Sequence, residues 1–211
     1  KPTIIEPKFN LPILYINLDS RKDRREHMDK LLEGYNYERV SAVYDEFGYI
    51  GCSKSHIKCM DIIIEKGYDK CVILEDDFMW KNDNNFENLR LPVIDYDIFL
   101  FCNNIKKSQV ISQYFNRVID ASWTSGYIVN KTIVKSLRDN MNEGVTKLSS
   151  KYEEDKKKGL NEPMDKYFDF FLDIYWIKLF DKYRVIGLNK MPAKQLPGYS
   201  DIRKININRD N

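Results

Sequence analysis

The sequence has little of what identifies several large classes of protein. It contains no run of about 18 apolar residues, which argues against a membrane-spanning helix. Its formal net charge is only +2, so neither nucleic acid nor an anionic membrane is expected as an obligatory partner. No glycine-rich phosphate loop follows the first apolar run, which argues against a nucleotidyltransferase. The partner must therefore be sought in a specific site.

The cysteines are also few, and they form no C-x-x-C pair. Cys52 and Cys59 would lie about 10 Å apart along one helix, which is too far for a disulfide. Their spacing gives little support to a zinc site. Cys71 and Cys102 lie within apolar runs and are expected to be buried thiols. The cysteines therefore say little about the cellular compartment.

The beginning of the sequence, KPTIIEPKF, has neither an initiator methionine nor a signal-peptide pattern. We interpret the sequence as a segment of a longer chain, whose targeting signal or anchor could lie elsewhere. With 211 residues, of which 43% are hydrophobic, the segment is expected to form a single domain with its own core.

Apolar strand patterns and helical patterns alternate in the first half. Strands are predicted at Ile13–Leu18, Tyr37–Val43, Cys71–Glu75 and Tyr96–Asn103. A helix is predicted from Ser20, with Asp23 completing a capping-box-like start, and another over Ser53–Lys66, closed by Gly67. Such alternation predicts an α/β fold with a central, mainly parallel mixed sheet.

The second half has a different pattern. Short strands are predicted at Asn116–Ser122 and Ser125–Asn130, followed by a helix over Thr132–Met141. The polar and charged stretch 142–163 predicts an exposed loop or flap. Another helical region is expected over Met164–Phe180, and then a short strand at Arg184–Leu188.

Three acids end the third predicted strand. Side chains alternate along an extended chain, so Glu75 and Asp77 are expected on one side and Asp76 on the other. Ligands of parallel sheets bind beyond the carboxyl ends of the strands, where these acids lie. Carboxylates there suit a hard cation such as Mg²⁺ or Mn²⁺, although strands also end in acids for structural reasons alone.

Six segments together resemble glycosyltransferase family 25, the lipooligosaccharide glycosyltransferases and collagen galactosyltransferases. They are YINLDSRKDRREHM (15–28), GCSKSH (51–56), ILEDD (73–77), SGYIVN (125–130), PMDKYF (163–168) and MPAKQLPGYSDI (191–202). Ser53 and Lys54 depart from the apolar pair of that family's Gly-Cys-x-x-Ser-His segment. Each segment by itself is weak evidence for the family, but the order and spacing of all six follow the family along nearly the whole chain.

The resemblance implies a GT-A type nucleotide-sugar-binding fold, a UDP-sugar donor and a Mn²⁺ or Mg²⁺ ion. The expected metal ligands are Asp77, Glu75 and Asp201. The expected donor-binding residues are Asn17, Leu18, Arg21, Arg24, Ser55, His56, Glu75, Asp76, Gln195 and Ser200. Because the family inverts configuration, a further carboxylate is expected as the base, with Asp165 as the first candidate and Asp173 as the alternative.

The implied reaction moves a hexose, galactose or glucose, to a hydroxyl acceptor. The acceptor could be hydroxylysine of a collagen-like protein or a lipooligosaccharide sugar. Localisation would be the cytoplasm or the endoplasmic reticulum lumen, depending on the missing flanking sequence. A catalytically silent, glycosyltransferase-like binding or adhesion module is the alternative, although such a module has no need of the three acids. The sequence leaves the oligomeric state open.

Overall fold

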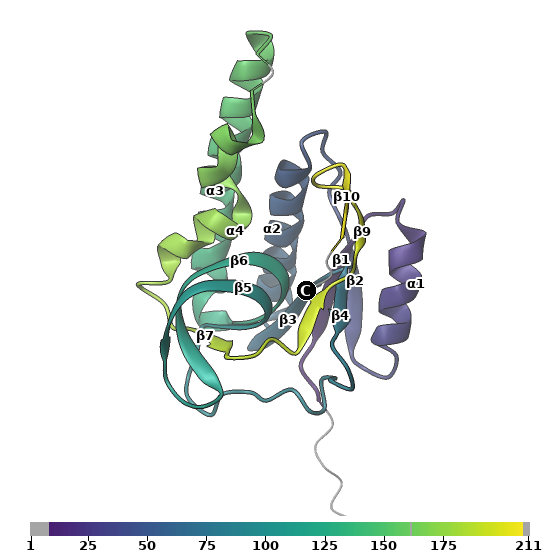
Figure 1. Ribbon diagram of the computed structural model, residues 1–211, viewed down its shortest axis with the longest axis vertical. Coiled ribbons are helices and arrows are strands. Elements are labelled where there is room, and N and C mark those ends of the chain that lie inside the picture. Colours follow the sequence, from purple (N-terminus) through teal and green to yellow (C-terminus); the bar gives the residue numbers. More distant parts are fainter. Residues whose placement is uncertain (1–8, 161, 209–211) are drawn as a thin grey trace, which may run out of the picture.

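Five strands that run in one direction and one that runs against them form the central sheet (Figure 1). The computed structural model describes residues 9–160 and 162–208. The sheet order is β2-β1-β3-β6-β5-β7, and only β6 is antiparallel to its neighbours. The bounds are β1 Ile13–Asn17, β2 Tyr37–Ser41, β3 Lys70–Glu75, β5 Ile98–Val110, β6 Phe115–Asn130 and β7 Val185–Leu188. The predicted α/β class with a mainly parallel mixed sheet is confirmed.

Both faces of this sheet are buried. Along β3, Cys71 and Ile73 pack on one face, while Val72 and Leu74 pack on the other. The first face is covered by α2 (Gly48–Lys66) and α3 (Lys131–Lys157), and the second by α1 (Lys22–Leu31), as Figure 1 shows. This double burial explains why the strands are apolar runs without polar alternation.

The two early helices differ from their predictions at their starts. The predicted capping box at Ser20 is wrong, because α1 begins at Lys22 without a side-chain cap and Asp23 instead forms an ion pair with Arg21. Helix α2 begins at Gly48, five residues before the predicted Ser53, and ends as predicted at Gly67 in the left-handed conformation. The GCSKSH segment therefore lies inside α2 and not at its first turn.

The prediction of an exposed loop or flap over 142–163 is wrong for most of its length, because α3 continues to Lys157. Met141, Val145 and Leu148 are spaced by four and three residues, so their side chains form one buried stripe. Gly144 lies in the same stripe, where an added Cβ would come within 2.9 Å of Tyr175. Asn161 lies outside the described residues.

In the second half of the chain, the observed strands and helices are joined or divided differently from the predicted ones. The two short strands predicted at 116–122 and 125–130 are one strand, β6, with the non-glycine residue Trp123 at a φ of 67°. The helical region predicted over 164–180 is three short pieces, η1 (Met164–Phe170), α4 (Leu172–Tyr175) and η2 (Trp176–Leu179). Phe171 has extended backbone angles and separates the first two pieces.

Short strands bring the end of the chain to the sheet. Strand β4 (Phe78–Trp80), directly after the three acids, pairs with β8 (Ala193–Gln195), and β9 (Gly198–Ser200) pairs with β10 (Ile205–Ile207). In Figure 1 the β9–β10 hairpin lies between α1 and α2. Among the described residues, none of the helices is long and apolar enough to span a bilayer.

Candidate functional site

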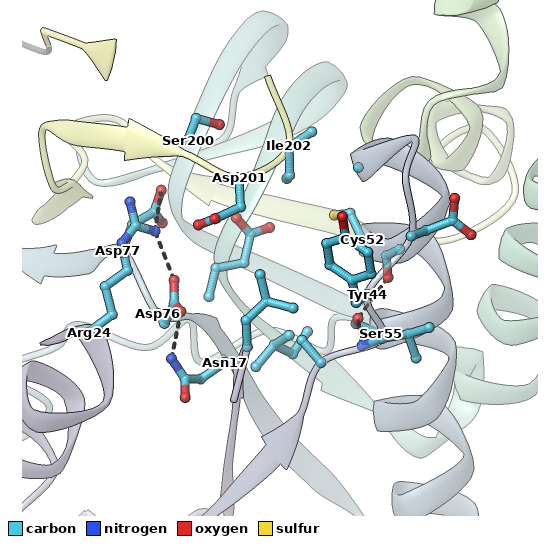
Figure 2. A pocket seen from close by; sticks show the side chains of 18 of the residues that line it. Asn17, Arg24, Tyr44, Cys52, Ser55, Asp76, Asp77, Ser200, Asp201 and Ile202 are labelled. Atoms are coloured by element: carbon cyan, nitrogen blue, oxygen red, sulfur yellow. Dashed lines mark hydrogen bonds and ion pairs between the residues drawn. The ribbon is translucent and has the colours of Figure 1, made fainter. Parts of the chain in front are cut away.

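A cavity of about 310 Å³ lies where β1, β2 and β3 end, at the edge where a ligand of a parallel sheet is expected. Its walls come from the segments after these strands, the first half of α2 and the β9–β10 hairpin. Figure 2 shows the side chains of Asn17, Arg24, Asp76 and Asp77 on one side, Tyr44, Cys52 and Ser55 on the other, and Ser200, Asp201 and Ile202 from the hairpin.

Asp76 belongs to the side of this cavity nearest α1. Its carboxylate accepts hydrogen bonds from Asn17 Nδ2 at 2.8 Å and from Arg24 Nη1 at 2.8 Å. The side chains of Arg24 and Asp76 are only 12% and 13% exposed. Burial raises the pKa of Asp76 above its ordinary value, although Arg24 and Asn17 act in the opposite direction. Asp76 therefore orients the Arg24 guanidinium at the cavity wall.

Glu75 points to the opposite side, toward α2 and β6. Thr124 Oγ1 donates a hydrogen bond to Glu75 Oε1 at 2.6 Å, and His56 Nε2 lies 3.3 Å from the same oxygen. The other ring nitrogen of His56, Nδ1, is 2.8 Å from the Tyr127 hydroxyl. His56 and Tyr127 are both fully buried. The contacts of Glu75 are thus distinct from those of Asp76, as the alternation of side chains predicts.

Asp77 lies at the junction of the larger cavity and a smaller neighbouring one of about 90 Å³. Its side chain is buried, and Oδ2 is 3.9 Å from Arg24 Nη1. Its backbone carbonyl accepts a hydrogen bond from Leu196 N, which fixes the end of the chain next to the acids. Glu75 also lines both cavities, whereas Asp76 lines only the larger one.

The arginines after β1 contact the β9–β10 hairpin. Arg21 Nη1 forms an ion pair with Asp201 Oδ2 at 2.5 Å, and Arg24 Nη2 donates to the Tyr199 carbonyl at 2.9 Å. Arg24 and Asp201 line the larger cavity, while Arg21 contacts two residues of its wall, Asp201 and the Tyr199 carbonyl. Leu18 also lines the cavity. These contacts place guanidinium groups and a carboxylate together at the cavity mouth.

Three other predicted donor residues have defined contacts. Ser55 donates to the Gly51 carbonyl at 2.7 Å and accepts from Val43 N at 2.9 Å, so it ties α2 to the segment after β2. Gln195 is buried in the smaller cavity, where its amide donates to Ser125 Oγ. Ser200 lines both cavities. Every predicted donor residue is therefore at or next to one of the two cavities.

The two candidate bases are in different places. Asp165 is exposed on η1 and lines neither cavity. Asp173 lines the smaller cavity, where its Oδ2 accepts the backbone N–H of Trp123 at 3.0 Å. Burial is the main reason that the pKa of Asp173 is raised, and the negative charge of Glu75 adds to it. The structure thus brings Asp173, and not Asp165, close to the acids after β3.

Trp123 and Thr124 were not among the predicted site residues, yet both line the smaller cavity. The φ of 67° at Trp123 costs on the order of 1 kcal/mol for a residue with a side chain, and such conformations are enriched at functional sites. Its indole is 40% exposed. The sequence gives one signal for them, since both immediately precede the SGYIVN segment.

Cys52 is a further residue that the sequence did not identify as part of a site. It is partly exposed, lines both cavities and forms no disulfide. Ligand atoms of Cys52, His56 and Glu75 lie within 4.8 Å of one another, which makes this set a possible metal site. Burial, followed by the negative charges of Glu75, Asp173 and Asp77, raises the pKa of the Cys52 thiol.

Comparison with known proteins gives a family match over half of the chain. Residues 46–152 match the model of glycosyltransferase family 25, described as an LPS biosynthesis protein. This range contains the GCSKSH, ILEDD and SGYIVN segments, while the other three motif segments lie outside it. The search of curated protein sequences gave no match.

Several solved structures are similar in shape at low sequence identity. One is A197 from STIV, at 12% identity and a TM-score of 0.49, with 95% of each chain covered. Another is a glycosyltransferase involved in glycosylation of the major capsid of PBCV-1, at 14% identity and a TM-score of 0.40, covering 64% of this chain and 67% of that one. The third is a nucleoside-diphosphate-sugar pyrophosphorylase from Vibrio cholerae RC9, at 12% identity and a TM-score of 0.40, covering 83% and 71%.

Proposed function

The chain belongs to glycosyltransferase family 25, and from this membership we propose a specific reaction for it. The enzyme moves galactose or glucose from a UDP-sugar to a hydroxyl acceptor, with inversion and with the help of Mn²⁺ or Mg²⁺. One observation carries the proposal. Arg24, Asp77 and Asp201 line a single cavity at the carboxyl ends of three parallel strands.

The donor is assigned to the larger cavity. A nucleoside diphosphate carries negative charge, and a guanidinium can bind its phosphate oxygens with two parallel hydrogen bonds. Arg24 is oriented for this by Asp76 and is largely shielded from bulk solvent, which strengthens its interaction with an anion. The part of the cavity beside the segment after β2, which includes the exposed Tyr44, is where the nucleoside would bind in a GT-A type arrangement.

The carboxylate ligands in this cavity fit a hard cation. Asp77 and Asp201 present carboxylate oxygens, the ligand type that Mn²⁺ and Mg²⁺ prefer, and two carboxylates with phosphate oxygens and water are a usual coordination sphere for them. When bound, the cation would supply positive charge to the diphosphate as it leaves. Glu75 is the weaker candidate for this ion because its contacts are with Thr124 and His56.

The acceptor is assigned to the smaller cavity, which adjoins the larger one at Glu75 and Asp77. Asp173 is the proposed base, which accepts the proton of the attacking hydroxyl. The exposed indole of Trp123 provides a flat apolar surface for a sugar ring or an aliphatic side chain beside it. Both a lipooligosaccharide sugar and the hydroxylysine of a collagen-like protein fit this chemistry.

Release of UDP from sugar nucleotides tests the proposal. The wild-type protein is expected to release UDP from UDP-galactose or UDP-glucose with Mn²⁺, in the presence of an oligosaccharide or a hydroxylysine-containing peptide. Chelator should abolish this release, and so should Asp77→Ala. Asp83→Asn is the matched control, since Asp83 is exposed and lines neither cavity.

Three outcomes would count against parts of the proposal. Turnover that is insensitive to chelator contradicts the metal. Release of pyrophosphate from a sugar phosphate and a nucleoside triphosphate would indicate a nucleotidyltransferase. A folded wild-type protein that releases no UDP with any sugar nucleotide or acceptor contradicts the assigned reaction.

A further inference from the structure

Helix α2 presents two metal-ligating side chains one turn apart. Cys52 and His56 are four residues apart, so both face the same direction, and Glu75 at the end of β3 lies opposite them. We propose that Cys52, His56 and Glu75 bind one divalent cation of the Zn²⁺ class, at a site separate from the hard-cation site at Asp77 and Asp201.

The distances suit a cation of this class. In a tetrahedral site with the usual bond lengths of about 2.3 Å to sulfur and about 2.0–2.1 Å to nitrogen, the two ligand atoms are about 3.6 Å apart. The ligand atoms of this cluster are all within 4.8 Å of one another, and His56 Nε2 is 3.3 Å from Glu75 Oε1. The ligand atoms are therefore already near the spacing that such a cation requires.

The ligands are held by a second set of contacts. Tyr127 OH fixes Nδ1 of His56 at 2.8 Å, which turns Nε2 toward Glu75. Thr124 fixes Oε1 of Glu75 at 2.6 Å. A metal-bound histidine nearly always has a hydrogen-bond partner on its second nitrogen, and ligating carboxylates are hydrogen-bonded in the same way. These contacts would hold both ligands in place for a cation between them.

The chemistry of the set decides which cations bind. A thiolate and an imidazole prefer Zn²⁺ or Co²⁺, whereas Mg²⁺ prefers oxygen ligands alone. Three protein ligands would leave one position of a tetrahedral cation for water or substrate, and both cavities give access to Cys52 and Glu75. The cation also supplies positive charge where Glu75, Asp77 and Asp173 meet.

Without a metal, the same contacts form a hydrogen-bonded pair of His56 and Glu75 with Cys52 as a neutral neighbour. Titration of the reduced protein with Co²⁺ separates the two cases, because a thiolate bound to Co²⁺ gives a charge-transfer band in the near ultraviolet. We expect the band to saturate at one equivalent of Co²⁺ and to be lost in Cys52→Ser. It should persist in Cys59→Ala, a buried cysteine of the same helix, and in Asp77→Asn.

A measurement on the unmodified chain covers the case in which a variant fails to fold. Zn²⁺ should slow the alkylation of Cys52, because the metal occupies the thiolate. Peptide mass spectrometry measures how fast Cys52 is alkylated. A wild-type protein without the cobalt band, a band that survives in Cys52→Ser, or alkylation unaffected by Zn²⁺ would each overturn the proposal. Neither readout depends on sugar transfer, so a protein that binds Co²⁺ but releases no UDP would contradict only the proposed function.

Discussion

Asp173→Asn is the change that most directly tests how the two cavities are used. The carboxyl group of Asp173 lines the smaller cavity and accepts the backbone N–H of Trp123 at 3.0 Å. An asparagine amide oxygen can accept the same hydrogen bond, so the strained backbone at Trp123 should keep its conformation. The variant loses the ability to take a proton and retains the shape of the site.

General bases contribute about 10²- to 10⁴-fold to enzymatic rates. At about 1.36 kcal/mol for each factor of ten, the barrier to transfer should rise by about 2.7–5.4 kcal/mol in Asp173→Asn. Binding of the donor should change little, because Asp173 does not line the larger cavity. The expected pattern is therefore a large loss of kcat with a nearly unchanged KM for the UDP-sugar.

The pH profile provides a second readout. Burial raises the pKa of Asp173, so its carboxylate is lost at a higher pH than that of an ordinary aspartate as the solution becomes more acidic. Because only the carboxylate can act as a base, the wild-type rate should fall with decreasing pH through this raised pKa. The acidic limb should be missing from the residual activity of Asp173→Asn.

The assay is transfer to acceptor, measured by mass spectrometry of the product beside UDP release. Asp165→Asn is the comparison, since Asp165 is exposed and lines neither cavity. Full transfer by Asp173→Asn together with loss in Asp165→Asn would refute the assignment. Equal losses of kcat in both, with both folded, would refute the argument from the cavities.

Arg24→Ala should weaken binding of UDP about 10- to 100-fold by calorimetry, since hydrogen bonds to charged groups are worth about 1.5–3 kcal/mol, while the exposed Arg25→Ala should bind as wild type. Gly51→Ala should lower stability by about 1–3 kcal/mol in urea unfolding, because the added Cβ would lie 2.5 Å from the Val43 carbonyl oxygen. Trp176→Ala should cost about 3–5 kcal/mol in the same measurement, since the indole is fully buried and its N–H donates to the Ala121 carbonyl.

The strands and the helix before Gly67 could be predicted because each depends on a local pattern. Strand β3 is buried on both faces and is therefore apolar throughout, and Gly67 adopts the left-handed conformation that favours glycine after a helix. The predicted helix ended too early, at Met141, because charged residues surround the buried stripe of α3 beyond this point. Val145 and Leu148 carry that stripe. Their packing partners Ile50, Tyr167 and Phe171 all lie outside the helix.

The residues around the larger cavity could be predicted from the strand ends. In the smaller cavity, Asp173 and Gln195 were predicted, but the wall formed by Trp123 and Thr124 was not. Leu74 pairs with Gly126, and because β6 runs against β3, the residues before Gly126 lie next to Glu75. Thr124 reaches Glu75 for this reason alone. No local pattern distinguishes a reversed strand within such a sheet, so the position of Trp123 and Thr124 follows only from the assembled sheet.

The three acids act differently because the strand stops among them. Glu75 is the last residue of β3 and Phe78 begins β4, so Asp76 and Asp77 form the turn between two strands. Asp76 turns toward Arg24 on the α1 side, and Glu75 toward His56 on the α2 side. Asp77 remains between them, at the junction of the cavities. One short acidic run therefore orients Arg24, contributes a ligand to the proposed thiolate–imidazole site and offers a carboxylate to the cation proposed for the sugar nucleotide.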